Sequence, residues 1–195
     1  IHVIEKIHGI GKPEDPERFI HIPADALSEA IQERMEHFRA PLAELGIEVS
    51  TGRVVDFRSA EFLREKPGPK TVPLIYPGHL LHGYVQWPKN GGKKPNALAL
   101  APETEELIVP QGYYVLVKRF SSKERRRRIM AGVYDPSRLP ASDVAFENHL
   151  NYFHAHGRPL SRDLAKGLAA FLNSTLVDSY FREWSGHTQV NASDL

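Results

Sequence analysis

The stretch VLVKRFSSKERRRRIMAGVY, residues 115–134, joins two apolar ends through a strongly basic middle. From Lys118 to Arg128 it contains seven lysines or arginines and a single acid, Glu124. The β-branched and aromatic residues at both ends are typical of strands, whereas a charged, serine-bearing middle is typical of an exposed turn. The stretch therefore predicts two strands joined by a basic connection.

Short strand-like runs fill the centre of the chain on both sides of this connection. They are IEVSTGRVVDF (47–57), TVPLIYPGHL (71–80), GYVQWP (83–88), NALAL (96–100), GYYVLVKRF (112–120), RIMAGVY (128–134) and DVAFENHLNYFH (143–154). Turn-forming residues separate them, notably in REKPGPK and PKNGGKKPN, which also carry lysines. Residues 1–22 hold glycines and prolines among short apolar pieces and read as a linker or edge strand.

Two segments with apolar residues at helical spacing flank the β-rich centre. In residues 23–38 the stripe consists of Leu27, Ile31, Met35 and Phe38. In residues 161–186 it consists of Leu164, Leu168, Phe171, Leu172, Leu176, Phe181 and Trp184, and Ser161 and Gly186 are suitable cap and stop residues. We expect an α+β fold with a β-rich central region, an N-terminal helix and one long C-terminal amphipathic helix.

Composition limits the class of protein. The chain has 195 residues, of which 41% are hydrophobic and 25% charged, as in ordinary globular domains. It has no cysteine, which excludes disulfides and thiolate metal sites within it. The sequence predicts no membrane segment or signal peptide and is compatible with the cytoplasm. Starting at Ile1, it reads as a piece of a longer protein.

Charge is distributed unevenly, although the formal net charge is only +1. Residues 1–52 carry five basic and ten acidic side chains, whereas residues 53–133 carry fifteen basic and seven acidic ones. Residues 134–195 carry five basic and seven acidic side chains. A basic middle between acidic ends favours a surface that faces a polyanion, and a solvated basic face fits the charges equally well.

Catalytic and metal motifs are absent from the sequence. The tightest histidine group, His149, His154 and His156, lacks the accompanying cysteines or glutamate of a known zinc motif. No GxSxG elbow, GxxxxGK[ST] loop or GxGxxG loop occurs. We therefore expect no catalytic residue and no metal in this chain.

Binding residues are better represented. Serine, lysine and arginine in the basic connection are the usual partners of DNA phosphates, and a short helix starting there would favour anions at its N-terminus. Residues 78–96 add the donors, amides and rings that contact nucleic acids: His82, Tyr84, Gln86, Trp87, Lys89, Asn90, Lys93, Lys94 and Asn96. An exposed hairpin around a buried tryptophan is the structural alternative.

Several of these strings together resemble one family. VSTGRVVDFR (49–58), VPLIYPGHLLHGYVQWP (72–88), YVLVKRFSSKERRRR (114–128), FENHLNYFH (146–154) and LAAFLNSTLVDSYFREWSGHTQVNASDL (168–195) are similar to the C-terminal part of adenine-specific DNA methyltransferases of type II restriction–modification systems. In that family an N-terminal portion binds S-adenosyl-L-methionine and carries an Asn/Asp-Pro-Pro-Tyr/Phe motif. This sequence contains no such motif.

The resemblance implies a division of the chain and a set of DNA contacts. Residues 1–45 would join a catalytic domain lying N-terminal to this chain, and residues 46–195 would form a target recognition domain. Its partners would be double-stranded DNA and that methyltransferase domain, and the cofactor would belong to the parent enzyme. The residues expected at DNA are Lys118, Arg119, Ser122, Lys123, Arg125, Arg126, Lys93, Lys94, Trp87, His187 and Gln189. For SGHTQVN (185–191), a structural turn leading to a closing strand is slightly favoured over DNA contact.

Three other functions fit the residues less well. An RNA-binding domain would use the same basic loops and rings on single strands. A protein-interaction domain would dock its acidic helix 24–38 on a partner and would show no salt-dependent binding of nucleic acid. A histidine-metal hydrolase would contain bound metal.

Overall fold

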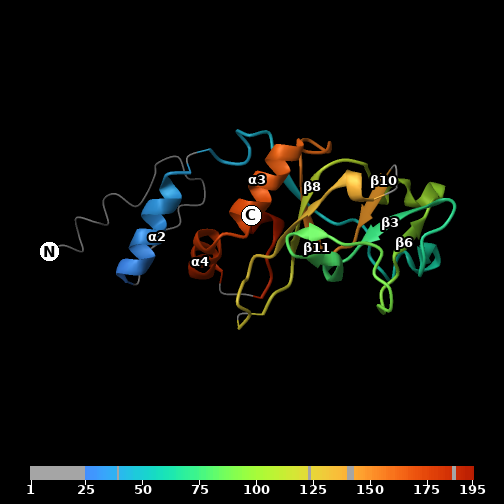
Figure 1. The fold of residues 1–195 in the computed structure, drawn as a ribbon, viewed down its shortest axis with the longest axis horizontal. Coiled ribbons are helices and arrows are strands. Elements are labelled where there is room, and N and C mark those ends of the chain that lie inside the picture. Colours follow the sequence, from blue (N-terminus) through green and yellow to red (C-terminus); the bar gives the residue numbers. More distant parts are fainter. Residues whose placement is uncertain (1–24, 39, 123, 140–142, 186–187) are drawn as a thin grey trace.

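The computed structural model describes residues 25–38, 40–122, 124–139, 143–185 and 188–195. These residues form two mixed β-sheets with helices gathered toward one end (Figure 1). The expected α+β class is confirmed. The linker or edge strand expected in residues 1–22 lies outside the described residues. No helix in the described part of the chain is long and apolar enough to cross a membrane.

Six strands make the larger sheet, in the order β1-β11-β8-β9-β5-β4. Their bounds are β1 (Glu48–Thr51), β11 (Leu150–His154), β8 (Tyr114–Lys118), β9 (Ala131–Tyr134), β5 (Tyr84–Val85) and β4 (Leu80–Leu81). β8 and β9 pair antiparallel, with Val115 opposite Val133 and Val117 opposite Ala131. The two strands predicted from residues 115–134 are therefore confirmed as neighbours, and the basic connection joins their adjacent ends.

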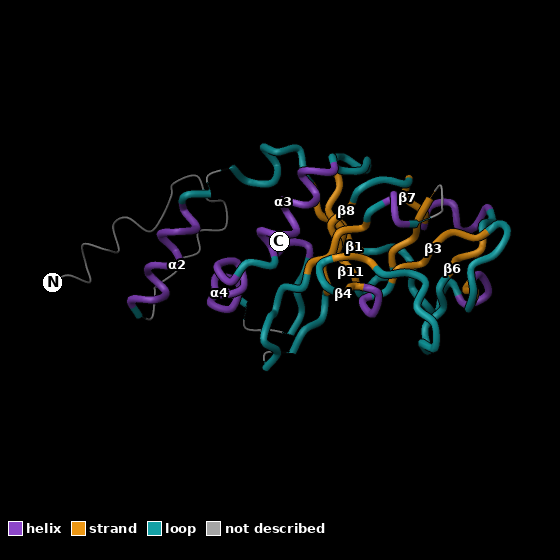
Figure 2. Tube along the Cα trace, viewed as in Figure 1, coloured by secondary structure: helices purple, strands orange, loops and turns teal. Residues whose placement is uncertain are grey.

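Five strands make the smaller sheet, in the order β2-β6-β3-β10-β7. Their bounds are β2 (Leu63–Arg64), β6 (Ala97–Ala99), β3 (Thr71–Ile75), β10 (Asp143–Phe146) and β7 (Ile108–Pro110). β10 runs parallel to β3 and antiparallel to β7, so the sheet is mixed. After β10 the chain passes directly into β11 of the larger sheet, which links the two sheets at the centre of the molecule (Figure 2).

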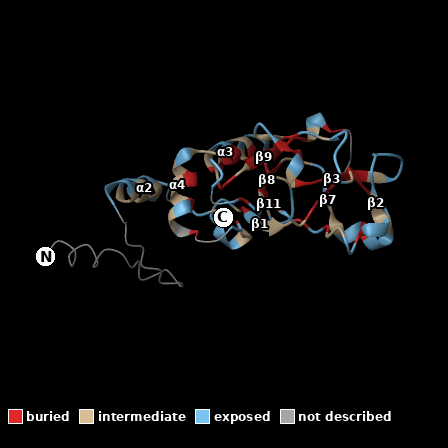
Figure 3. Cartoon of the chain, turned by 90° about the horizontal axis from the view of Figure 1, so that it is seen from below, coloured by how far each residue is buried: buried red, intermediate tan, exposed pale blue. Residues whose placement is uncertain are grey.

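Alternation along β8 places this strand between two hydrophobic cores. Val115 and Val117 pack in a cluster with residues of the C-terminal helices. Tyr114 and Leu116 point to the other face and pack in a cluster that includes residues of the smaller sheet, such as Phe146. Figure 3 shows the buried residues concentrated along this central region, with exposed residues around it. The order is helices, larger sheet, smaller sheet.

The C-terminal segment differs from the single long helix that we expected. It forms two helices, α3 (Arg162–Leu172) and α4 (Thr175–Trp184), separated at Asn173 and Ser174. The Asn173 side chain bonds both backbone groups of Ala131 in β9, with its amide donating at 3.0 Å and its oxygen accepting at 3.1 Å. Ser174 accepts from the Val177 N–H and caps the second helix. Ser161 caps α3 as expected, whereas Gly186 lies outside the described residues.

The N-terminal helix α2 (Ala26–Glu36) is capped by Asp25, which accepts from the Ser28 N–H at 2.8 Å. It lies beside α4 at the end of the molecule (Figures 1 and 3). Of its predicted apolar stripe, Met35 packs against the core while Leu27 stays largely exposed. Just beyond the helix, Phe38 is exposed but places its ring 4.7 Å from that of Phe171.

Candidate nucleic-acid interface

The connection between β8 and β9 is an extended loop, which we call the basic loop (residues 119–130). Figures 1 and 2 show it projecting from the sheets, on the same side as the loop that follows β5. Its described residues contain turns and bends and no helix, so the short helix considered from the sequence is wrong there. Anion binding by a helix N-terminus is thereby removed as an explanation for this loop.

One arginine of the run is a buried structural residue. Arg128 is only 1% exposed, and its Nε donates to the Ser121 hydroxyl at 3.0 Å. Its guanidinium also lies over the ring of Phe181 of α4, at 5.4 Å from the centroid. Burial of a charge is tolerated where hydrogen bonds and an aromatic face compensate for lost water. Arg128 therefore fastens the end of the basic loop to the helical layer.

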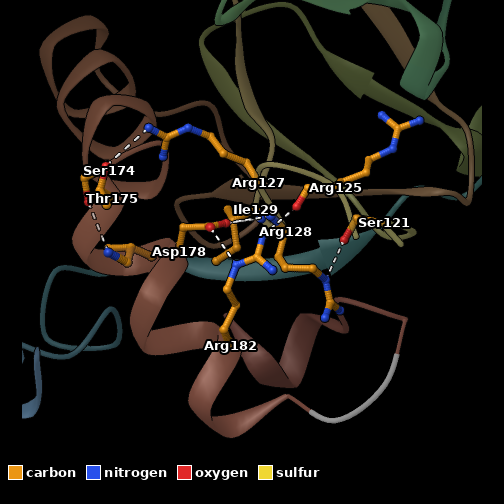
Figure 4. A network of polar contacts seen from close by, with 10 residues as sticks. Ser121, Arg125, Arg127, Arg128, Ile129, Ser174, Thr175, Asp178 and Arg182 are labelled. Carbon is orange, nitrogen blue, oxygen red and sulfur yellow. Dashed lines mark hydrogen bonds and ion pairs between the residues drawn. The ribbon is translucent and has the colours of Figure 1, made fainter. Parts of the chain in front are cut away.

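A carboxylate of α4 completes this attachment (Figure 4). Asp178 Oδ1 accepts from the backbone N–H groups of Arg128 at 2.6 Å and Ile129 at 3.2 Å. Its Oδ2 accepts from Arg182 Nε at 2.9 Å. Arg182 reaches the loop in turn, since its Nη2 donates to the carbonyl of Arg125 at 2.7 Å. The loop is thus held at three backbone positions by two neighbouring side chains of one helix.

The remaining arginines of the run are placed differently. Arg125 and Arg126 are exposed. Arg127 is half-buried, and its Nη2 donates a long hydrogen bond of 3.4 Å to Thr175 (Figure 4). The four consecutive arginines therefore divide into two that face outward, one at the margin and one inside.

The residues before the run are partly enclosed. Lys118 is half-buried at the end of β8; burial, with the nearby charges of Arg125 and Lys89, lowers its pKa. Arg119 donates from Nη1 to the Asn148 carbonyl at 2.8 Å, and its Nε is buried without a hydrogen-bond partner in the structure. Ser122 is exposed, and Lys123 lies outside the described residues.

The lysine-bearing loop between β5 and β6, residues 86–96, is organised by a buried amide. Asn96 accepts from the Lys89 N–H at 2.9 Å and donates to the carbonyls of Glu65 and Lys89. Trp87 is half-buried, packs against the inter-sheet core and donates its indole N–H to the Asn96 carbonyl at 2.6 Å. The tryptophan thus has a structural role, and its contact with DNA stays a prediction.

The two lysines near the tip of this loop are both exposed. Lys94 Nζ bonds Asp56 at 2.6 Å and lies over the Tyr76 ring, at 5.1 Å from its centroid. The same aspartate accepts from the Tyr76 hydroxyl at 2.6 Å. The Lys94 side-chain hydrogen bond therefore raises the pKa of Lys94, and the loop tip is tied to the smaller sheet. Lys93 stands next to this pair on the rim of a pocket.

A pocket of about 400 Å³ lies between this loop and the beginning of the basic loop. Its lining residues are Tyr76, Pro77, Gly78, His79, Lys89, Gly92, Lys93, Lys94, Phe120, Glu147 and His149. Glu147 is 1% exposed and accepts from both the backbone N–H and Nδ1 of His149. The pocket was not expected from the sequence, because its walls come from segments up to about 70 residues apart.

The last described segment pairs with the chain just after β8, where the basic loop begins. Gln189 bridges to Phe120, and the N–H of Val190 donates to the Arg119 carbonyl at 2.7 Å. The Ser121 N–H donates to the Thr188 carbonyl at 3.1 Å. These contacts support the structural interpretation of SGHTQVN. Gln189 is nevertheless exposed, whereas His187 lies outside the described residues.

The histidines do not form a metal or hydrolytic centre in the described part of the chain. No group of three or more potential ligands converges there. Ser50 Oγ lies 2.8 Å from His154 Nε2, and Glu48 lies 3.7 Å from Nδ1 of the same ring. This resembles a Ser-His-Glu triad only superficially, since Nδ1 accepts from the Gly157 N–H and so cannot donate to the carboxylate.

Comparison with known proteins finds two longer proteins that are similar to this chain. It is 48% identical over 186 residues to the type II methyltransferase M.PstI of Providencia stuartii, and 50% identical over 186 residues to the type II methyltransferase M.BsuBI of Bacillus subtilis. Each alignment covers 95% of this chain and 37% of the relative. The chain is thus homologous to little more than a third of each methyltransferase. No family model and no solved structure matches it.

Proposed function

We propose that this chain is the DNA target recognition part of an adenine-specific type II methyltransferase. Residues 46–195 form the recognition domain, and residues 1–45 lead into it from a catalytic domain elsewhere in the same polypeptide. The similarity to 37% of two type II methyltransferases supports a partial enzyme, and the motifs quoted from the sequence support the adenine class. In the cell this would be a cytoplasmic protein of a restriction–modification system.

The observation that carries this proposal is the convergence of cations from two loops. Lys118 ends β8, Arg125 belongs to the basic loop, and Lys89 comes from the loop after β5. Burial lowers the pKa of Lys118, and the nearby charges of Arg125 and Lys89 lower it further. Like charges held close together raise the free energy of the isolated protein, and a polyanion removes that cost. Two loops that project from the same side of the sheets suit a DNA backbone (Figure 1).

We propose the following roles for individual residues. The residues that contact phosphates are Lys118, Ser122, Lys123, Arg125 and Arg126. Those of them that the structure describes are exposed or half-buried on the projecting loop. Arg119 contributes mainly by positioning the loop through Asn148. Lys93 and Lys94 extend the positive surface, and Trp87 fixes their loop. Gln189 lies beside the start of the basic loop, where it bridges to Phe120, and DNA contact by Gln189 and His187 remains part of the proposal.

S-adenosyl-L-methionine does not fit the residues described. Its sulfonium is a cation, whereas the pocket between the two loops is lined by three lysines, Lys89, Lys93 and Lys94, against one carboxylate, Glu147. Neither a glycine-rich cofactor loop nor the Asn/Asp-Pro-Pro-Tyr/Phe motif occurs in the sequence. We therefore assign cofactor binding and methyl transfer to the rest of the parent enzyme, and no catalytic step to this chain.

Binding of random-sequence duplex DNA at several salt concentrations tests the proposal. The variant Arg125→Gln/Arg126→Gln removes two exposed charges without touching the buried network. Arg158→Gln/Arg162→Gln is a control, because these two arginines are also exposed and lie outside the loop. Each lost phosphate contact lowers the slope of log K against log salt by roughly 0.9, so the first variant should lose a slope of about 2. The control should keep the wild-type slope.

Two results would contradict the proposal. Failure of the wild-type chain to bind duplex DNA at low salt would favour a protein-interaction domain. Displacement of bound duplex by an equal concentration of single-stranded RNA would favour an RNA-binding domain. The substitution Lys118→Ala/Arg119→Ala/Lys123→Ala is a less selective test, because it also removes the hydrogen bond from Arg119 to Asn148.

A further inference from the structure

We propose that the pocket between the basic loop and the lysine-bearing loop (residues 86–96) holds a nucleotide that has left the base stack of the bound DNA. Its base would lie against Phe120, and its phosphate would lie between Lys89 and Lys93. The inference rests on the proposed DNA-binding function and adds a second kind of contact to it. The pocket would belong to this chain and be separate from any site of methyl transfer.

The first support is an aromatic side chain that the fold leaves open. Phe120 is 44% exposed although Arg119 lies beside its ring and Lys89, Lys93 and Lys94 line the same pocket. Its ring centroid is 5.2 Å from that of His149 and 5.8 Å from the Arg119 guanidinium carbon. Exposure of an apolar ring to water costs free energy, which is recovered when a nucleobase stacks on the ring. The phosphate of the same nucleotide would then reach the neighbouring cations.

The second support is a preorganised polar group on the adjoining wall. Glu147 is buried and accepts from the backbone N–H and Nδ1 of His149, so the carboxylate fixes the orientation of the ring. With Nδ1 committed to the carboxylate, Nε2 is the ring nitrogen available to a ligand. The His149 side chain is 51% exposed, which leaves its edge accessible from the pocket.

The third support is the size and the shape of the site. A volume of about 400 Å³ falls within the range of roughly 300–1,000 Å³ for sites that enclose small organic ligands. Stacked duplex DNA presents phosphates and base edges at its surface, whereas the face of a base becomes accessible only when that base is unstacked. A concave site with a ring on its wall and lysines on its rim therefore matches a displaced nucleotide better than an intact duplex.

The test compares two duplexes of the same sequence, one fully paired and one carrying a single bulged 2-aminopurine nucleotide. The 195-residue wild-type chain should bind the bulged duplex roughly 5- to 100-fold more tightly and should quench the 2-aminopurine fluorescence by stacking. Phe120→Ala should abolish this preference while leaving the affinity and salt slope for the paired duplex unchanged. Phe120→Tyr should retain the preference, because the ring is conserved.

Phe38→Ala serves as the matched control. Phe38 is also a half-exposed phenylalanine in contact with one other ring, but it lies beside Phe171 among the helices. This variant should keep the preference for the bulged duplex. A loss equal to that of Phe120→Ala would mean that general destabilisation explains the effect, and it would overturn the proposal.

The outcomes separate this proposal from the proposed function. Equal affinity of wild type for both duplexes would overturn the pocket alone and leave DNA binding intact. No binding of either duplex at low salt would overturn both. A third arm uses free 2-aminopurine deoxynucleoside monophosphate: quenching at lower concentration than with the bulged duplex would identify a free nucleotide as the ligand and overturn assignment to a displaced one.

Discussion

Replacement of Asp178 by alanine should destabilise the domain more than any exposed charge change. The Asp178 carboxylate accepts from the backbone N–H groups of Arg128 and Ile129, and it pairs with Arg182. Asp178 is 6% exposed, so the two N–H groups would be left buried without an acceptor. Each such orphaned donor costs roughly 1–3 kcal/mol, and partial relaxation brings the expected total to about 3 kcal/mol.

Urea denaturation followed by circular dichroism measures this change as a shift in the free energy of unfolding. Asp163→Ala is the control, because Asp163 is an exposed aspartate in the first turn of α3 and should cost less than about 1 kcal/mol. Asp178→Asn retains an oxygen for the loop amides and should fall between the two. If Asp178→Ala unfolded with the same free energy as the control, the loop would not depend on α4, and our account of the network would be wrong.

The remaining predictions concern three buried positions. Burial lowers the pKa of His79 to about 4 from 6.5, so the unfolded chain binds a proton that the folded chain excludes. The free energy of unfolding is therefore unaffected by His79 above about pH 6.5 and decreases as the pH falls toward 4. Denaturation of the wild type at pH 7 and at pH 4.5 measures this decrease. His79→Gln should reduce the decrease by about 2–3 kcal/mol. Gly52→Ala would place a Cβ 2.2 Å from the Glu147 carbonyl, and thermal unfolding should show a loss of several kcal/mol, whereas an unchanged midpoint would exclude this close contact. Asn96→Ala removes the acceptor of the part-buried Lys89 N–H and the donor to the Glu65 and Lys89 carbonyls, and it should cost about 2 kcal/mol in urea denaturation, with weaker DNA binding as a second readout.

The strands flanking the basic loop were predictable because their signal is local. β8 is buried from Tyr114 to Val117 because the stretch YVLV is apolar on both faces of the pleated strand, and AGVY in β9 is buried throughout for the same reason. The break between α3 and α4 could not be found by the same means. Asn173 is compatible with a helix surface, and what turns it out of the helix is a contact with Ala131, 42 residues away.

The candidate interface was predictable in composition but not in detail. Arg125 and Arg128 are chemically identical and three positions apart, yet one is exposed and the other is 1% exposed. The difference arises from Ser121, Asp178 and Phe181, which surround Arg128 only after the helices have packed on the larger sheet. A run of like charges carries no periodicity from which such partners could be deduced.

The division of the arginine run has a consequence for recognition. A loop of exposed cations tied down only at its ends would lose conformational entropy on binding DNA, and that loss would weaken the complex. Here the inner arginine and two side chains of α4 hold the loop backbone at Arg125, Arg128 and Ile129 before any ligand arrives. The buried arginine thus reduces the conformational entropy that its exposed neighbours lose when DNA binds. On this argument Asp178→Ala weakens DNA binding with little change in salt slope, because it disorders the phosphate-binding side chains without removing their charges.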